Sequence, residues 1–176
     1  MIVVVGSPVA VVDGASFDAA GLAALTAIEL AAKGASVELI GRVGNDAAGD
    51  AVVLALGRAG VGHAALLRDA ARSTPIGATS DGIPFDTGDL GLALRYLTTF
   101  EAAIFIAPVG ARQASEALLS LMRDGAAFAG ARLIVVSAES LVASVVGVEE
   151  SQTMHIAPGD ESHAALAARL AALAMA

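Results

Sequence analysis

The sequence contains no cysteine and no tryptophan, and aromatic residues make up only 3% of it. The absence of cysteine excludes disulfides, thiolate metal sites and cysteine nucleophiles. It is also consistent with a reducing compartment, and we expect a cytoplasmic location. Charged residues are scarce, at 16%, and the ten basic residues are scattered within a net charge of −8. Nucleic acid is therefore excluded as a partner, because binding phosphates requires clustered Lys and Arg.

Long uninterrupted apolar runs are absent too. A membrane-spanning helix needs about twenty consecutive apolar residues, and breakers or charges interrupt every run before that length. The apolar start, Met1–Val5, has no basic segment before it and is followed closely by Gly6 and Pro8. We interpret it as a first strand and not as a signal peptide, and we expect no contact with a membrane.

What the sequence has in abundance is aliphatic residues, since 56% of its 176 residues are hydrophobic. Such a composition excludes disorder and supplies a sizeable core. The length suits one domain better than two. We therefore predict a single domain over residues 1–176.

Short aliphatic runs alternate with helical patterns that end at glycine. We predict strands at 2–5, 36–40, 63–68, 102–106, 133–136 and 153–156. We predict helices at 16–33, 47–59, 89–97, 113–129 and 160–175, the first of them capped by Ser16 or Asp18. This alternation is typical of a three-layer, doubly wound α/β fold, in which a mainly parallel sheet carries helices on both faces.

One segment carries a motif, a Gly-x-x-Gly-x-Asp-x-x-Gly turn from Gly41 to Gly49 that follows a strand and precedes a helix. Gly41 and Gly44 permit a tight turn, and Asp46 is a good N-cap for the helix. Together with 3–7, 34–40 and 73–77, the turn resembles the early part of the ribokinase/PfkB family of carbohydrate kinases. The resemblance implies a ribokinase-like core, here without the family's β-sheet lid because the segment for it is short.

The same resemblance implies an Asp after the first strand and a Gly-Gly…Asn segment that hold the sugar hydroxyls. In this sequence the Asp position falls on Ala10, the Asn position on Leu25 and the Gly-Gly on Ala20-Gly21. A leucine offers no hydrogen bond. Asp13 is the candidate substitute for substrate binding, and the alternative is that Asp13 is a turn residue beside Gly14.

The family's second signature is a Gly-Ala-Gly-Asp turn, whose N–H groups bind the transferred phosphate and whose Asp is the base. The nearest match is Ala157-Pro158-Gly159-Asp160. The resemblance implies that Gly159 would bind the phosphate of the cofactor and that Asp160 would be catalytic. Pro158 lacks an N–H and so removes one donor. The alternative is that Asp160 is the N-cap of the last helix.

Two other groups of residues contain side chains that could bind a metal ion. His155 and His163 flank Asp160, but their spacing is not that of a zinc-binding helix, and we predict no metal site. Three acids between 81 and 89 do not repeat closely enough for calcium, and we interpret this segment as a loop.

These observations favour a non-catalytic, shortened ribokinase-like domain that acts by oligomerisation or by binding a partner or a small metabolite, with no cofactor. The alternative is an active PfkB-type kinase that transfers phosphate from ATP, with Mg²⁺, to a sugar hydroxyl. With few charged residues to cover the surface, we expect a homo-oligomer, and a two-fold dimer is the default.

Overall fold

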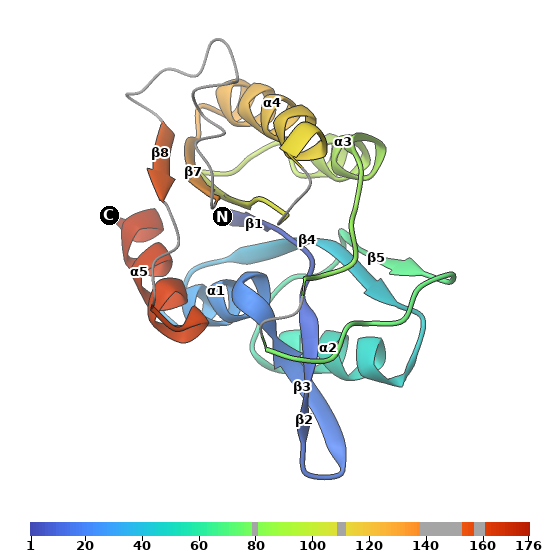
Figure 1. Cartoon of the computed structure of the whole chain (residues 1–176). Coiled ribbons are helices and arrows are strands. Elements are labelled where there is room, and N and C mark those ends of the chain that lie inside the picture. The colour runs from blue at the N-terminus through green and yellow to red at the C-terminus, as the bar shows by residue number, and fades with distance from the viewer. Residues whose placement is uncertain (79–80, 109–111, 138–152, 157–160) are drawn as a thin grey trace.

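The computed structural model describes residues 1–78, 81–108, 112–137, 153–156 and 161–176. In these residues six strands form one sheet in the order β5-β4-β1-β6-β7-β8, and every neighbouring pair is parallel (Figure 1). Short β-branched and aliphatic runs suit strands that are buried on both faces. The strands are β1 (Ile2–Val5), β4 (Val37–Gly44), β5 (Leu66–Asp69), β6 (Ala102–Ile106), β7 (Arg132–Val136) and β8 (Thr153–Ile156).

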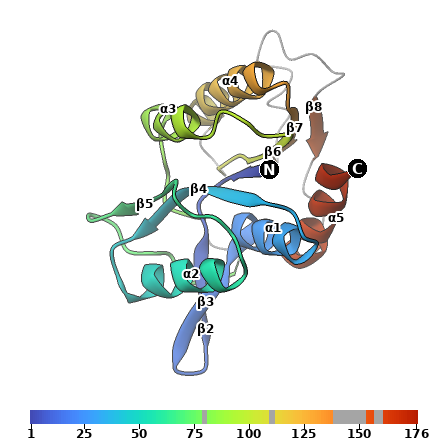
Figure 2. The same ribbon diagram turned by 180° about the vertical axis from the view of Figure 1, so that it is seen from behind.

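Helices cover both faces of the sheet. On one face lie α1 (Gly21–Ala32), α2 (Ala47–Arg58) and α5 (His163–Met175). On the other lie α3 (Thr87–Tyr96) and α4 (Arg112–Ala129), as the two opposite views show (Figures 1 and 2). The prediction of a three-layer, doubly wound α/β fold is confirmed. No helix in the described part of the chain is long and apolar enough to cross a membrane.

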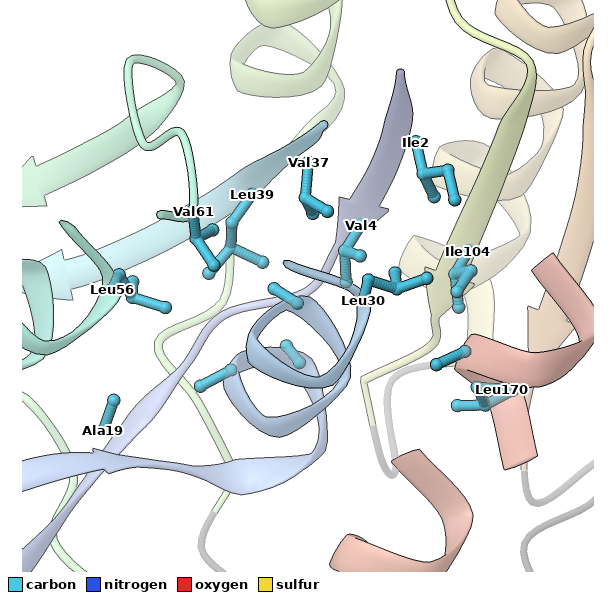
Figure 3. Close-up of a cluster of buried hydrophobic side chains, with 14 of the residues drawn as sticks. Ile2, Val4, Ala19, Leu30, Val37, Leu39, Leu56, Val61, Ile104 and Leu170 are labelled. Atoms are coloured by element: carbon cyan, nitrogen blue, oxygen red, sulfur yellow. The ribbon is translucent and has the colours of Figure 1, made fainter. Parts of the chain in front are cut away.

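The central strand β1 divides the core into two clusters. Ile2 and Val4 point toward α1 and join a cluster that reaches Leu30 and Leu170 (Figure 3). Val3 and Val5 point the other way and pack in the cluster of α3 and α4. Successive strand residues face opposite sides, so a run of four valines and isoleucines supplies both clusters at once.

A small antiparallel hairpin, β2 (Val9–Asp13) and β3 (Ser16–Ala20), lies apart from the main sheet and beside α2. The prediction of a helix from Ser16 is wrong over residues 16–20, which form β3, and α1 begins at Gly21. Phe17 and Ala19 pack in the core cluster on the side of α1 and α2, while Ser16 and Asp18 are exposed. This alternation has the period of two that is typical of a strand. The hairpin occupies the segment in which the resembled family has a β-sheet lid, and in which we expected none because the segment is short.

Other boundaries also differ from the sequence-based expectation, and two of them bear on the site. Strand β4, predicted to end at residue 40, continues through Gly44 because its last four residues pair with β5. The last helix begins at His163, and its N-cap is Ser162, whose hydroxyl accepts a hydrogen bond from the N–H of Ala165 at 3.2 Å. The hypothesis that Asp160 is this N-cap is therefore wrong.

Candidate functional site

The chain reverses its direction of travel across the sheet at β1. From β1 it proceeds to β4 and β5 on one side, and it then returns to β6, β7 and β8 on the other. In open α/β sheets, ligands bind beyond the carboxyl ends of the strands at such a switch point. The first place to look for a site is therefore the end of β1 and the neighbouring end of β6.

A pocket of about 280 Å³ lies there. It is lined by the residues that follow β1, β6 and β7, by the first residues of α1 and α5, and by the segment 81–85. Pockets for small molecules usually measure about 300–1,000 Å³. The pocket lies just below this range, so its size suits a compact ligand.

The start of α1 forms one side of the pocket. Gly21 turns the chain from β3 into the helix with a φ of 80°, a conformation that favours glycine. Ala20, at the N-cap position, makes no side-chain cap hydrogen bond. The end of β1 approaches this helix closely, because a Cβ on Gly6 would lie 3.1 Å from the Cβ of Ala23. The first N–H groups of α1 thus lie beside the pocket without a side-chain acceptor.

The segment 81–85 forms another part of the wall, and Ser7 holds it in place. The Ser7 hydroxyl donates to the carbonyl of Ile83 at 2.6 Å and accepts from the N–H of Arg42 at 2.9 Å. Gly82 packs directly on Ser7, since a Cβ there would lie 2.6 Å from the Ser7 Cβ. One hydroxyl therefore connects the end of β1, strand β4 and the pocket wall.

Arg42 fixes the chain beyond this wall. Its guanidinium forms ion pairs with Asp89 at 2.8 Å and with Asp69 at 3.4 Å. The hydrogen bond to Asp89 raises the pKa of Arg42 above its ordinary value, although burial opposes this. Asp89 also belongs to the capping box of α3 with Asp86. The first turn of α3 is thereby tied to the carboxyl ends of β4 and β5.

Two ionisable side chains line the pocket in the described residues, Asp81 and His163. Asp81 is exposed at the rim. The Nδ1 atom of His163 is buried and has no hydrogen-bond partner. Sequence reasoning missed both, because Asp81 was interpreted as a loop residue and His163 was weighed only as a metal ligand. The available signal for His163 was its place at the start of a helix that follows a strand.

The residues that the sequence nominated do not meet in this pocket. Asp13 lies at the exposed far end of β2, pairs with Ser16 across the hairpin and does not line the pocket. Gly159 and Asp160 lie outside the described residues. Ala10, at the position of the sugar-binding Asp, is fully buried in the core and outside the pocket lining.

No group of three or more His, Asp or Glu side chains that could hold a metal is found among the residues that the structure describes. Asp160 and the side chain of His155 fall outside them. The metal arrangement considered from the sequence therefore stays untested.

The turn motif at Asp46 forms a second polar cluster, away from the pocket. The Asp46 carboxylate accepts hydrogen bonds from the N–H of Gly49, the N–H of Thr74 and the hydroxyl of Thr74, each at 2.8 Å. The Thr74 hydroxyl in turn accepts from the N–H of Gly44 at 2.9 Å. Burial alone would raise the pKa of Asp46, but the hydrogen bonds outweigh it and hold this pKa below its ordinary value. The prediction that Asp46 caps α2 is confirmed.

The strand order, the helices on both faces and the small hairpin define a ribokinase-like α/β fold, shared with solved carbohydrate kinases of the PfkB type. A fructokinase from Xylella fastidiosa with bound ATP matches with a TM-score of 0.61 and 14% identity, over 85% of this chain and 55% of its own. An aminoimidazole riboside kinase from Salmonella enterica, complexed with aminoimidazole riboside and an ATP analog, matches with a TM-score of 0.60 and 15% identity, over 85% and 54%.

A PfkB protein from Polaromonas sp. JS666 is similar at a TM-score of 0.62 and 17% identity, over 77% of this chain and 54% of that one. The chain thus spans about half the length of these structures. No family model and no curated protein matches the sequence. The similarity at this level of identity establishes a ribokinase-like fold over about half the length of these kinases.

Proposed function

We propose that this chain is a non-catalytic ribokinase-like domain that binds a small metabolite in the pocket at the end of β1. The observation that carries the proposal is the pocket itself, a mostly apolar hollow at the switch point that is lined by the first residues of α1, whose N–H groups have no side-chain acceptor. Ligand sites in α/β proteins combine such an apolar lining with a few polar groups that set orientation.

The sugar-binding positions support a role without phosphoryl transfer. Ala10 and Leu25 stand where the family resemblance implies an Asp and an Asn. Ala10 is buried in the core, and neither residue lines the pocket. Pro158 also removes an N–H from the segment that matches the phosphate-binding turn. These positions are the ones on which orientation of a sugar hydroxyl would depend.

A ligand screen by thermal shift tests the proposal, because a compound that binds only the folded state raises the melting temperature. Ala107→Phe fills the pocket, since Ala107 lines it, and Ala32→Phe places the same side chain on an exposed position of α1. We expect a small metabolite to stabilise the wild type and Ala32→Phe but not Ala107→Phe. A panel of metabolites without effect, or with equal effect on both variants, contradicts the proposal.

The alternative is an active carbohydrate kinase, favoured by the fold shared with a fructokinase that has ATP bound. In that case Asp160 would be the base, Gly159 would bind the phosphate of ATP, and Mg²⁺ would be required. A coupled assay of ATP turnover over a panel of sugars, with Asp160→Asn as the control, separates the two functions. Sugar-dependent turnover that disappears in Asp160→Asn would replace the non-catalytic proposal.

We also propose that the chain forms a two-fold homodimer. Large apolar side chains are exposed at the ends of α3 and α4 and near the hairpin tip, namely Tyr96 (80%), Phe128 (82%) and Val12 (60%). Exposed apolar surface is a common site of association, and two-fold dimers are the commonest assemblies. Light scattering at micromolar concentration should give twice the mass of the chain, and a stable monomer would contradict this.

A further inference from the structure

The exposed aromatic side chains of this chain lie on one layer of the fold. The chain has one tyrosine and five phenylalanines, all within the residues that the structure describes. Of these six, Tyr96 and Phe128 are exposed, at 80% and 82%, and the others are buried or half-buried. The two exposed residues belong to α3 and α4, which cover the same face of the sheet (Figure 1). Exposed apolar side chains that gather in this way mark a surface for association.

The outward side of α3 carries a small residue near its start and a large one at its end. Leu90 and Ala93 are buried toward the sheet. Gly88, Leu92 and Tyr96 are exposed. Residues four apart lie on the same side of a helix, so these three form one stripe, and Leu92 is its midpoint.

Close contacts at two glycines set the register between α3 and α4. A Cβ on Gly91 would lie 3.8 Å from Leu121, and a Cβ on Gly125 would lie 3.0 Å from Leu94. The helices are therefore packed side by side and run in the same direction, because the later residue of α3 meets the later residue of α4. Leu92, which follows Gly91, is level with the residues just after Leu121.

On α4 a small and a large residue lie at equal distances from this level. Ala117 and Phe128 are exposed and lie three turns apart, on the same side of the helix. Their midpoint falls between residues 122 and 123, level with Leu92. The outer surface formed by Gly88, Leu92, Tyr96, Ala117 and Phe128, here named the α3–α4 face, thus has two large residues at one end and two small ones at the other.

The α3–α4 face is complementary to itself under a two-fold rotation. If the axis passes at the level of Leu92, across the helices, the helices of two copies become antiparallel. Tyr96 of each copy then meets Gly88 of the other, and Phe128 meets Ala117. Large residues that face small ones fill the space between packed helices, and a two-fold interface uses the same surface of both copies.

The charges along α3 fit the same rotation. Its first turn has Asp86 and Asp89, and its last turn has Arg95. Arg95 is exposed and forms no ion pair with any residue that the structure describes. The Asp86 carboxylate is also exposed and accepts a hydrogen bond from the N–H of Asp89 at 3.0 Å. In the antiparallel arrangement Arg95 lies opposite the first turn of the second copy, so it can pair with Asp86 there.

We infer that a second copy of this chain docks on the α3–α4 face, with α3 and α4 antiparallel to their counterparts. The inference rests on the proposed homodimer and names its interface. Aromatic side chains can bury about 150–250 Å² each, so the four exposed rings of a dimer would bury about 500–800 Å². This is a large part of the roughly 1,200–2,000 Å² that a specific interface buries.

Sedimentation of the full chain over a concentration series measures the dissociation constant of the dimer. Tyr96→Ser should raise this constant about tenfold or more, because two buried rings are lost from each dimer. Val12→Ser removes an exposed apolar side chain from the hairpin and should leave the constant within about twofold. An unchanged constant in Tyr96→Ser, or an equal rise in Val12→Ser, overturns the inference.

The charge pair provides a second test that a folding defect would not imitate. Asp86→Asn removes the charge but keeps a side chain that caps α3, and Arg95→Gln removes the opposite charge. Each should weaken the dimer about threefold, and the double variant should be no weaker than either single variant. Arg58→Gln, in the last turn of α2, is the exposed control and should change nothing. Additive losses, or no loss in the single variants, overturn the inference.

The outcomes also separate this inference from the proposed function. A dimer that persists unchanged in Tyr96→Ser would overturn this interface and leave the homodimer. A wild-type chain that stays monomeric at micromolar concentration would overturn both. Metabolite binding in the pocket is measured separately by thermal shift, and neither result changes it.

Discussion

The starts of α1 and α2 are both helix N-termini that follow a strand, and they differ in whether side chains accept hydrogen bonds from their backbone N–H groups. At α2 the Asp46 carboxylate satisfies three donors, and Thr74 satisfies a fourth. At α1 the N-cap position holds Ala20, and the neighbouring imidazole of His163 has an unpartnered nitrogen. The contrast teaches that side chains satisfy the backbone donors at the start of α2, while the donors at the start of α1 have no side-chain acceptor.

The largest expected effect on stability lies at the start of α2, beside the cluster of Asp46 and Thr74. A Cβ on Gly44 would lie 2.5 Å from the Thr74 nitrogen and 2.7 Å from the Arg72 carbonyl oxygen, so the backbone must move. We expect Gly44→Ala to lower the free energy of unfolding by more than about 3 kcal/mol. Gly57→Ala, whose new Cβ meets only the His63 ring at 3.5 Å, should be neutral or stabilising. Urea denaturation measures both, and similar losses would contradict the assignment of strain to Gly44.

Removal of the carboxylate comes next. Asp46→Ala should cost about 2–3 kcal/mol, because it deletes a helix cap and leaves the buried N–H of Thr74 unpaired. Ser162→Ala removes a simple cap on α5 and should cost only about 1 kcal/mol. Chemical denaturation at neutral pH compares them. A cost at Asp46 no greater than that at Ser162 would mean that the link to Thr74 contributes nothing.

The same carboxylate should make stability depend on pH. Its pKa in the folded state lies below its ordinary value. Its contribution is therefore complete at neutral pH and is lost as the pH falls through the folded-state pKa. The difference in unfolding free energy between wild type and Asp46→Ala should shrink below about pH 4. A difference that is constant down to pH 2 would speak against an ionised Asp46 as the acceptor.

A smaller loss is expected at Ser7, which connects the pocket wall to β4. Ser7→Ala leaves the carbonyl of Ile83 and the N–H of Arg42 without this partner and should cost about 1–2 kcal/mol. Ser16→Ala, which removes an exposed hydroxyl that contacts Asp13, should cost almost nothing. Hydrogen exchange of the Arg42 amide should accelerate in Ser7→Ala alone. Unchanged exchange at this amide would show that the pocket wall is held by other contacts.

The smallest effect should have the opposite sign. His163→Leu removes a buried nitrogen without a partner, so without ligand it should leave the protein as stable as the wild type or more stable by up to about 1 kcal/mol. Residues kept for binding often cost stability in this way. His63→Leu loses a contact with the Val61 carbonyl and should destabilise. Thermal unfolding without ligand compares the two, and a clear loss of stability in His163→Leu would assign this side chain to the scaffold.

Features that depend on neighbouring residues were predictable from the sequence. The helix after Asp46 and the strand at 102–106 were found because an N-cap residue, a glycine stop and an aliphatic run are local signals. The start of α1 was not, since Ser16 and Asp18 are good caps and Leu22, Leu25 and Ile28 have helical spacing. The packing of Phe17 beside α2 determines that residues 16–20 form a strand, and no local sequence pattern reveals this contact.

The pocket was beyond prediction for a similar reason. Ser7, Ile83 and His163 come together only because β1 lies between β4 and β6, and the segment 81–85 folds back over its end. Alternation of strands and helices predicts a parallel sheet but leaves open which strands are neighbours. The resemblance to sugar kinases directed attention to Asp13 and Asp160. The carboxyl end of β1 itself bears glycine and serine, which carry no catalytic signal.

The central place of β1 has a consequence for how the chain folds. Its partner on one side, β4, follows soon after it, but on the other side Ile2 pairs with Ala102, and the terminal ammonium of Met1 meets Glu101, 100 residues later. During synthesis, β1 therefore stays unpaired on one side until the strand that begins at Ala102 has emerged. We therefore expect slow folding, during which one edge of an aliphatic strand is exposed and prone to aggregation. The yield of folded protein should then depend on chaperones and on temperature.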